Sequence, residues 1–224
     1  MKTAALIVAA GRGTRLGAEV PKQYIPLNGP CALRRSVELF LSLDAISSVV
    51  CVVHADDAAR YAAAMEGLRS SAVMAPVIGG ATRAMSVRAG LEALEPQGPD
   101  AVLIHDAARP FMPLEVILSV LGALEVSEGA CAGLPVVDAL WDASDGAARS
   151  SVPREGLWRG QTPQGFRFGP ILAAHRAHVG DSADDVAVAV DAGLAVQFVP
   201  GSEAGYKITT PDDLARALRE TAAG

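Results

Sequence analysis

Short hydrophobic runs alternate along the chain with longer segments in which hydrophobic residues recur every three or four positions. The runs that predict buried strands lie at 4–9, 49–53, 73–77, 101–105, 130–135 and 195–199. The amphipathic segments that predict helices lie near 32–43, 56–69, 84–94 and 114–126. Strands that alternate with helices are typical of βαβ units, which build a mostly parallel sheet flanked by helices. The pattern therefore predicts an α/β fold, with a single Rossmann-like domain over residues 1–224.

The segment 136–168 interrupts this alternation. It contains turn-forming residues and two tryptophans, Trp141 and Trp158, in place of a helical pattern. We predict hairpins here that project from the sheet as a β-arm. A disordered loop is the alternative, which the two large aromatic side chains disfavour. An arm that carries aromatic residues is suited to docking on a second copy of the chain, so we expect a homodimer.

The pattern resumes after the predicted arm, with helical segments near 169–178 and 184–192, a short strand and a closing helix. Thr210 and Pro211 followed by two aspartates predict the start of that last helix, with Thr210 as its N-cap. His175 and His178 are expected on an exposed helix face, where they lack a third residue to complete a zinc site.

Composition narrows the class of protein. Half of the 224 residues are hydrophobic but only 4% are aromatic, so we expect a core of Ala, Val, Leu and Ile. The formal net charge of −6 disfavours a nucleic-acid partner. No apolar stretch reaches the length of a membrane span, and the three cysteines form no metal-binding or disulfide pattern. These features predict a cytoplasmic protein without a membrane or nucleic-acid partner.

A glycine-rich loop follows the first predicted strand. It contains Gly11, Gly13 and Gly17, with Arg12 and Arg15 between them and Lys22 shortly after. Glycines let backbone N–H groups approach an anion closely, and a strand end is a favourable place for such a site. The added cations suit a polyphosphate. The loop therefore predicts a site for a nucleoside triphosphate.

Spacing excludes two common alternatives. A dinucleotide-binding loop needs Gly-x-Gly-x-x-Gly, but Leu16 stands where the third glycine belongs. The P-loop needs Gly-Lys-Ser or Gly-Lys-Thr after its spacer, and that string does not occur. A tight turn without a ligand is the remaining alternative, and the cations around the glycines disfavour it.

Further candidate residues follow other predicted strands. Asp106 comes at the end of the strand 101–105, which places a carboxylate near the glycine loop, suited to holding Mg²⁺. Arg109 is placed to bind phosphate or to orient Asp106. A second glycine-rich loop, Gly79 to Ser86, enters a predicted helix and could contact a base, with Arg83 supporting the loop or a phosphate.

At this point the sequence is recognisable. The segment from Leu6 to Tyr24 resembles the signature of sugar-nucleotide pyrophosphorylases and related nucleotidyltransferases. Together with His-Asp-Ala-Ala-Arg-Pro at 105–110, Thr-Pro-Gln-Gly-Phe at 162–166 and Lys-Ile-Thr at 207–209, the chain resembles the family of 2-C-methyl-D-erythritol 4-phosphate cytidylyltransferases. The resemblance spans residues 4 to about 218.

The resemblance implies a reaction of CTP with a polyol phosphate, 2-C-methyl-D-erythritol 4-phosphate, assisted by Mg²⁺. It implies that the arm exchanges between the subunits of a homodimer. It assigns the catalytic roles to Arg15, Lys22, Arg154 and Lys207. It assigns nucleotide binding to Ala9, Ala10, Gly11, Gly13, Thr14, Gly80, Arg83 and Ser86. It assigns substrate binding to Asp106, Ala107, Arg109 and Thr162, with Asp106 also beside the metal.

Three residues depart from the family pattern, and two other functions stay open. Ala81, Ala139 and Ala183 stand where the family often has an acidic residue or a threonine, so contacts to the base or the acceptor differ here. A cytidylyltransferase acting on ribitol phosphate would share the fold and the glycine loop. A regulatory domain that binds CTP without turnover is the other alternative, which the number of cations disfavours.

Overall fold

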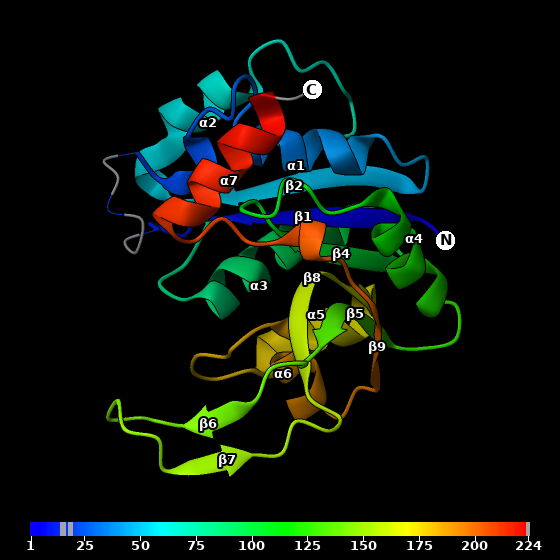
Figure 1. The fold of residues 1–224 in the computed structure, drawn as a ribbon. Helices are drawn as coiled ribbons and strands as arrows, with labels where there is room; N and C mark the ends of the chain where they lie inside the picture. Colours follow the sequence, from blue (N-terminus) through cyan, green and yellow to red (C-terminus); the bar gives the residue numbers. More distant parts are fainter. Residues whose placement is uncertain (14–16, 18–19, 223–224) are drawn as a thin grey trace.

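The computed structural model describes residues 1–13, 17 and 20–222. Its main sheet has seven strands in the order β3-β2-β1-β4-β8-β5-β9 (Figure 1). In chain order these are β1 (Thr3–Ala9), β2 (Ile46–Val53), β3 (Val77–Ile78), β4 (Ala101–Asp106), β5 (Gly129–Pro135), β8 (Trp158–Arg167) and β9 (Val196–Pro200). The strands β1, β2, β3 and β4 pair in parallel, as do β5 and β9. The prediction of an α/β fold with a mostly parallel sheet is confirmed.

Helices cover both faces of the sheet. The helices are α1 (Ala32–Leu41), α2 (Ala58–Met65), α3 (Arg83–Leu94), α4 (Leu114–Ala123), α5 (Phe168–Ala177), α6 (Asp185–Asp191) and α7 (Pro211–Ala222). Of these, α7 packs in a separate cluster with Leu27, Ala32 and Ile208. Short 3₁₀ turns lie at Lys22–Tyr24, Ala55–Asp57, Glu95–Gln97 and Glu203–Gly205. In β1, Ala5 and Ile7 join the core under α1 and α4, whereas Leu6 joins the core under α3 and α5. This alternation explains why β1 is hydrophobic throughout.

The predicted strand at 73–77 is wrong in its bounds. The regular strand β3 covers only Val77 and Ile78, and Val73 contributes an isolated bridge to Val49. The segment between them carries Pro76, whose missing N–H cannot take part in a strand ladder.

The predicted arm over residues 136–168 is wrong for the part that forms β8. Residues 158–167 do not project: they form a strand that pairs antiparallel with both β4 and β5. The strand is buried from Gln161 to Phe166. At Gly165 a Cβ atom would lie 2.7 Å from Val120 Cγ1 of α4, so only glycine lets the helix pack this closely. The register also shifts between Cys131 and Gly133, next to Pro163.

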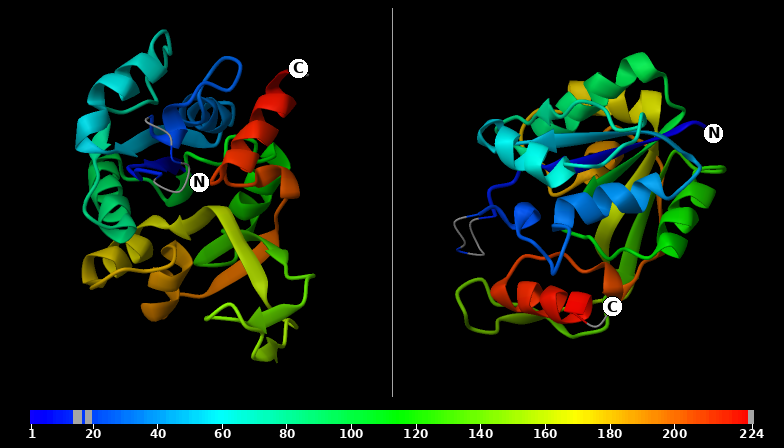
Figure 2. Two further views of the ribbon diagram at one scale, coloured as in Figure 1. Left: turned by 60° about the vertical axis from the view of Figure 1, so that its left-hand side comes forward. Right: turned by 90° about the horizontal axis from the view of Figure 1, so that it is seen from above.

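The remaining part of that segment forms a separate two-stranded ribbon. Its strands β6 (Leu140–Asp142) and β7 (Ser150–Val152) pair antiparallel with each other, outside the main sheet. The ribbon extends beyond the ends of β5 and β8 and stands apart from the helices in the left view of Figure 2. Its strands are largely exposed.

The start of α7 forms as the sequence predicts. Thr210 Oγ1 accepts a hydrogen bond from the backbone N–H of Asp213 at 3.2 Å. Asp213 Oδ2 accepts in return from the N–H groups of Thr210 and Thr209 at 2.8 and 2.9 Å. This reciprocal cap fixes the segment that carries Lys207, because Lys207 lies just before it.

Candidate active site

A cleft of about 440 Å³ opens at the carboxyl ends of β1, β2, β3 and β4. Parallel sheets bind ligands at this edge, because the loops that follow their strands meet there. Most of the predicted site residues line the cleft together: Ala9, Ala10, Gly11, Gly13, Lys22, Gly80, Arg83, Ser86, Asp106, Ala107 and Lys207. Thr14 and Arg15 lie outside the described residues.

The glycine loop is held in place by a buried glutamine. Gln23 Nε2 donates hydrogen bonds to the carbonyl oxygens of Ala9 at 2.7 Å and Gly11 at 3.0 Å. Gly13 has a φ of +65°, and a Cβ atom there would lie 3.2 Å from Lys22 Cγ. Gln23 was not among the predicted residues, although it directly follows Lys22 and is 3% exposed.

The second glycine-rich loop packs against the first. A Cβ atom at Gly79 would lie 2.7 Å from both Ala10 Cβ and Ser86 Oγ. Ser86 Oγ accepts from the N–H of Gly80 at 3.1 Å and donates to the carbonyl of Thr82 at 2.9 Å. Thr82 in turn caps α3 by accepting from the N–H of Met85. The hydroxyl of Ser86 therefore shapes this loop.

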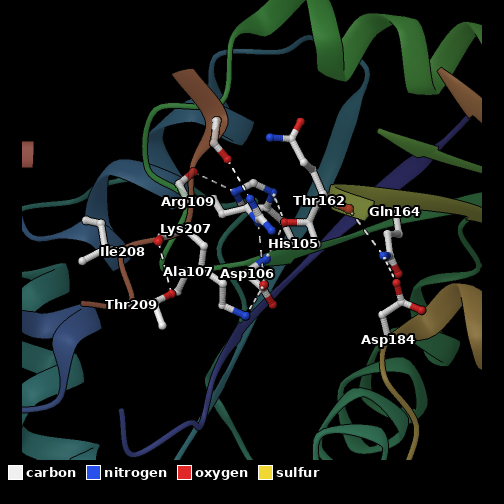
Figure 3. Close-up of polar contacts among 12 residues, drawn as sticks. His105, Asp106, Ala107, Arg109, Thr162, Gln164, Asp184, Lys207, Ile208 and Thr209 are labelled. Atoms are coloured by element: carbon white, nitrogen blue, oxygen red, sulfur yellow. Dashed lines mark hydrogen bonds and ion pairs between the residues drawn. The ribbon is translucent and has the colours of Figure 1, made fainter. Parts of the chain in front are cut away.

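Asp106 contributes a carboxylate to the lining of the cleft, and Figure 3 shows it among Lys207, Arg109 and Thr162. Its Oδ2 atom lies 2.8 Å from Lys207 Nζ and 3.9 Å from Arg109 Nε. Its Oδ1 atom lies 3.9 Å from Arg83 Nη2. Burial alone would raise the pKa of Asp106, but Lys207, Arg83 and Arg109 more than offset it, so its pKa lies far below the usual range. Asp106 is therefore ionised throughout the neutral range.

Two side chains, those of Thr162 and His105, support Asp106 from behind. The N–H of Asp106 donates to Thr162 Oγ1 at 3.1 Å, and Thr162 Oγ1 lies 3.1 Å from His105 Nδ1. Burial lowers the pKa of His105 to about 4, so its imidazole is neutral. His105 Nε2 lies 3.1 Å from the carbonyl of Arg109, which only accepts, so the proton resides on Nε2 and Nδ1 accepts from Thr162. His105 therefore has a structural role beside Asp106 (Figure 3).

Lys22 contacts the residue that directly follows Lys207 in the chain. Lys22 Nζ donates to the carbonyl of Ile208 at 2.6 Å, next to Lys207 and its contact with Asp106. The 3₁₀ turn that begins at Lys22 and the segment before α7 therefore lie against each other, although they are almost two hundred positions apart in the chain. The sequence places a cation in each segment but does not show that they meet.

Three predicted residues do not line the cleft. Arg154 follows β7, is exposed, and its guanidinium donates to the carbonyl of Val137. Thr162 is buried behind Asp106, with its hydroxyl in the hydrogen bonds described above. Arg109 donates to the carbonyl of Gly205 at 2.8 Å, and burial lowers its pKa, which Asp106 partly offsets.

Two further residues line the cleft: His54, which the predictions left out, and Arg12, one of the predicted cations of the glycine loop. His54 directly follows β2, and Arg12 lies in the glycine loop, with its Nη1 atom 3.3 Å from His54 Nδ1. Arg12 also lies 3.7 Å from the buried carboxylate of Asp57. The position of His54 at a strand end is the signal that would have found it.

The expectation for His175 is wrong. Its side chain is fully buried, and Nε2 lies 3.3 Å from Asp185 Oδ1, at the start of α6. Asp185 Oδ2 accepts from Arg83 Nη2 at 2.6 Å. The helix pattern placed His175 two residues before the end of α5 but gave no sign that α6 covers it.

The donor groups of the cleft fit one kind of metal site. Within the described ranges, no cluster of three or more histidine, cysteine, aspartate or glutamate side chains could hold an ion by itself. Mg²⁺ commonly binds through one or two carboxylates and the phosphates of its substrate. Asp106 is an ionised carboxylate in a cleft lined by cations, which suits Mg²⁺ bound to a triphosphate.

Known proteins resemble this chain over nearly its whole length. A family model described as IspD, 2-C-methyl-D-erythritol 4-phosphate cytidylyltransferase, matches residues 3–220. The protein of that name from Cereibacter sphaeroides is 50% identical over 219 residues, covering 98% of this chain and 96% of the relative. A bifunctional IspD/IspF enzyme from Rhodobacter capsulatus is also 50% identical, covering 98% of this chain and 57% of the relative.

Solved structures agree in fold. A crystal structure of 2-C-methyl-D-erythritol 4-phosphate cytidylyltransferase from Thermus thermophilus is 30% identical, with a TM-score of 0.78, and covers 99% of this chain and 100% of that chain. A crystal structure of 4-diphosphocytidyl-2C-methyl-D-erythritol synthase has a TM-score of 0.82 at 28% identity, covering 97% of this chain and 98% of that chain.

Proposed function

Because the chain belongs to the family of 2-C-methyl-D-erythritol 4-phosphate cytidylyltransferases, we propose roles for its cleft residues in that reaction. The chain is a nucleotidyltransferase of isoprenoid biosynthesis, and it acts on CTP and 2-C-methyl-D-erythritol 4-phosphate. The products are 4-diphosphocytidyl-2-C-methyl-D-erythritol and pyrophosphate.

The chemistry joins two anions. A phosphate oxygen of the acceptor attacks the α-phosphorus of CTP, and the bond from that phosphorus to the bridging oxygen of pyrophosphate breaks. The acceptor phosphate is already ionised at neutral pH, so the step needs no strong base. What it needs is close positioning and neutralisation of charge in the transition state.

The nucleotide occupies the side of the cleft formed by the two glycine-rich loops. Backbone groups from Ala9 to Gly13 face the phosphates, and Lys22 stabilises charge at the α-phosphorus. Arg15 shares that role on the family pattern, and Thr14 belongs to the same loop. Gly80, Ser86 and Arg83 form the wall for the cytidine. The hydrogen bonds of Gln23 to this loop support the assignment, because they hold its backbone open towards the cleft.

The acceptor occupies the side formed by Asp106, Ala107 and Lys207. The observation that carries this proposal is the contact of Lys207 with Asp106 at 2.8 Å, next to the Ile208 carbonyl that holds Lys22. A cation for the incoming phosphate and a cation for the α-phosphate are thereby held side by side. Arg109 and Thr162 act from behind by fixing Asp106.

Mg²⁺ is the proposed cofactor, held by Asp106 and the phosphates of CTP. When bound, it neutralises charge on the triphosphate. The residues of the chain do the rest. Lys207 keeps Asp106 ionised and oriented, and Lys22 and Arg15 have the proposed role of neutralising charge as pyrophosphate departs.

A homodimer through the β6–β7 ribbon completes the proposal. Large apolar side chains on the ribbon and beside it are exposed, among them Trp141 at 58% and Val137 at 67%. Arg154 lies at the base of this ribbon and not in the cleft of its own chain. Exchange of the ribbon between two copies would carry Arg154 to the acceptor phosphate of the partner subunit.

The cytoplasm is the proposed location, which the three free and buried cysteines support. No helix in the part of the chain that the structure describes is long and apolar enough to cross a membrane.

The test is pyrophosphate release from CTP in the presence of Mg²⁺ with two acceptors compared. We expect release with 2-C-methyl-D-erythritol 4-phosphate and little with ribitol phosphate. Release with ribitol phosphate alone would contradict the assigned acceptor, and release with neither would favour a CTP sensor. Omitting Mg²⁺ and adding a chelator should abolish release.

A further inference from the structure

A buried histidine is linked to the cleft through two charged residues. The side chains of His175 in α5 and Asp185 in α6 are both fully buried. His175 Nε2 lies 3.3 Å from Asp185 Oδ1, and Asp185 Oδ2 accepts from Arg83 Nη2 at 2.6 Å. Arg83 lines the cleft and lies 3.9 Å from Asp106. These contacts join α5 and α6 to the floor of the cleft.

The backbone around Asp185 is fixed by its neighbours. The N–H groups of Asp185 and Val186 both donate to Gln164 Oε1, at 3.0 and 3.2 Å. Gln164 Nε2 donates to Asp184 Oδ2 at 2.9 Å, as Figure 3 shows. Asp184 also caps α6 by accepting from the N–H of Ala187. These hydrogen bonds anchor the backbone at Asp185, so the orientation of its side chain depends on its two partners, Arg83 and His175.

A buried carboxylate requires a partner at each oxygen. Arg83 serves Oδ2, whereas Asp185 Oδ1 has no hydrogen-bond partner among the described residues. Its polar neighbour is His175 Nε2 at 3.3 Å, an ion-pair contact outside hydrogen-bond geometry. Burial alone would raise the pKa of Asp185, but Arg83 and His175 more than offset this effect and lower the pKa, so the carboxylate stays charged. Without His175, Oδ1 would be an unpaired charged atom, and the carboxylate would gain by rotating away from the geometry that holds Arg83.

We propose that His175 is a positioning residue for nucleotide binding, which orients Asp185 and thereby holds Arg83 against the cytidine side of the cleft. The proposal rests on the nucleotide-binding role proposed above for Arg83. The proposal predicts different effects on the binding of the two substrates. Arg83 stands beside the glycine-rich loop at 80–82, on the proposed nucleotide side, whereas Lys207 serves the acceptor. Loss of His175 should therefore weaken the binding of CTP and leave the binding of the acceptor unchanged.

The experiment compares three substitutions of His175. In His175→Gln the longer amide places a donor near the position of Nε2. In His175→Asn the shorter amide does not reach Asp185, and His175→Leu has no donor. We expect His175→Asn and His175→Leu to raise the KM and Kd for CTP about tenfold, the change that corresponds to about 1.4 kcal/mol. Their kcat and their KM for the acceptor should stay within about twofold, and His175→Gln should resemble the wild type.

Controls separate positioning from loss of stability. Leu172→Ala removes a buried apolar side chain from the same helix, so it should lower the melting temperature without changing the KM for CTP. If His175→Leu fails to fold, the comparison of His175→Asn with His175→Gln decides. A folded His175→Asn protein with the wild-type Kd for CTP would overturn the proposal, and so would an equal loss for both substrates.

The variant Arg83→Met separates the proposed role of Arg83 from the proposed role of His175. We expect it to weaken CTP at least as much as His175→Asn, and the double variant to be no weaker than Arg83→Met alone. Wild-type affinity in Arg83→Met would contradict the proposed role of Arg83 itself. Weak binding in Arg83→Met together with normal binding in His175→Asn would overturn only the role of His175.

Discussion

Single residues in this cleft carry charges that the surrounding structure fixes in place. Lys22 packs beside Gly13 and donates to the carbonyl of Ile208, so its position is set before any ligand arrives. Asp106 is held by Lys207 on one oxygen and by the buried Thr162 at its backbone N–H. Preorganised charges of this kind stabilise a transition state at little cost of reorganisation.

The substitution Lys22→Ala removes one such charge. We expect kcat to fall by about 10² to 10³, the usual loss for one preorganised stabilising group. Steady-state pyrophosphate release with both substrates saturating measures the effect. Lys2→Ala is the matched control, because Lys2 lies before β1, at the opposite end of that strand from the cleft. Unchanged kcat in Lys22→Ala would remove Lys22 from the mechanism.

His105 makes stability depend on pH. Its pKa falls from about 6.5 in the unfolded chain to about 4 in the folded one, because burial disfavours the charged ring. The unfolded chain then binds the extra proton, so stability is full above pH 6.5 and is lost as the pH falls towards 4. We expect the free energy of unfolding to drop by about 2 kcal/mol between pH 7 and pH 5 from this group.

Urea unfolding at a series of pH values tests this expectation, with His105→Gln as the comparison. The amide of glutamine does not titrate, so the variant should lose less stability than the wild type over the same interval. Parallel curves for the two proteins would show that His105 does not carry the dependence.

At the scale of elements, β8 shows where prediction from the sequence succeeds and fails. The strands β1, β2 and β4 and the helices between them follow from hydrophobic runs, because these strands are buried on both faces. In β8 the same burial is hidden by Gly160, Pro163 and Gly165, residues that usually mark turns. Contact with α4 requires Gly165, and only the packed structure shows that contact.

Two glycines near that contact give opposite predictions. Gly165→Ala would place a Cβ atom 2.7 Å from Val120 Cγ1 and 2.9 Å from Leu103 Cδ2, so we expect a loss of about 1 to 3 kcal/mol. Gly122→Ala lies on α4 itself with open space at the Cβ position, so we expect a gain of about 0.5 to 1 kcal/mol. Thermal and urea unfolding of both variants measure the difference. A neutral Gly165→Ala would mean that α4 can shift outward.

The sequence predicts those site residues that directly follow a predicted strand. The glycine loop and Asp106 follow strands β1 and β4, so the sequence indicates that they meet. Arg83 follows the short strand β3 in the same way, whereas Lys207 reaches the cleft from the segment before α7, which no strand end connects to it. The link from His175 to Asp185 requires α6 to cover the end of α5, a matter of tertiary packing alone.

For the whole molecule, the proposed exchange of the ribbon predicts complementation between inactive chains. Lys22→Ala and Arg154→Ala should each have low activity alone. In a mixed dimer, the site built on the Arg154→Ala chain would have its own Lys22 and Arg154 from the partner subunit. Random exchange of equal amounts should restore about a quarter of the wild-type activity.

The measurement is pyrophosphate release after the two variants are unfolded together and refolded. Refolding each variant alone before mixing, under conditions where dimers do not exchange, is the control. If the co-refolded mixture stays as inactive as its components, Arg154 does not act across the dimer.

The position of β8 between β4 and β5 has a consequence for how the protein folds during its synthesis. A ribosome finishes β4 about fifty residues before it begins β8, which amounts to roughly 3 to 10 seconds of synthesis. For that time β4 presents an unpaired edge of buried, hydrophobic strand, the kind of surface that recruits other chains. The nascent chain is therefore most exposed to misassembly midway through its synthesis, and this is the interval in which a chaperone would have most to shield.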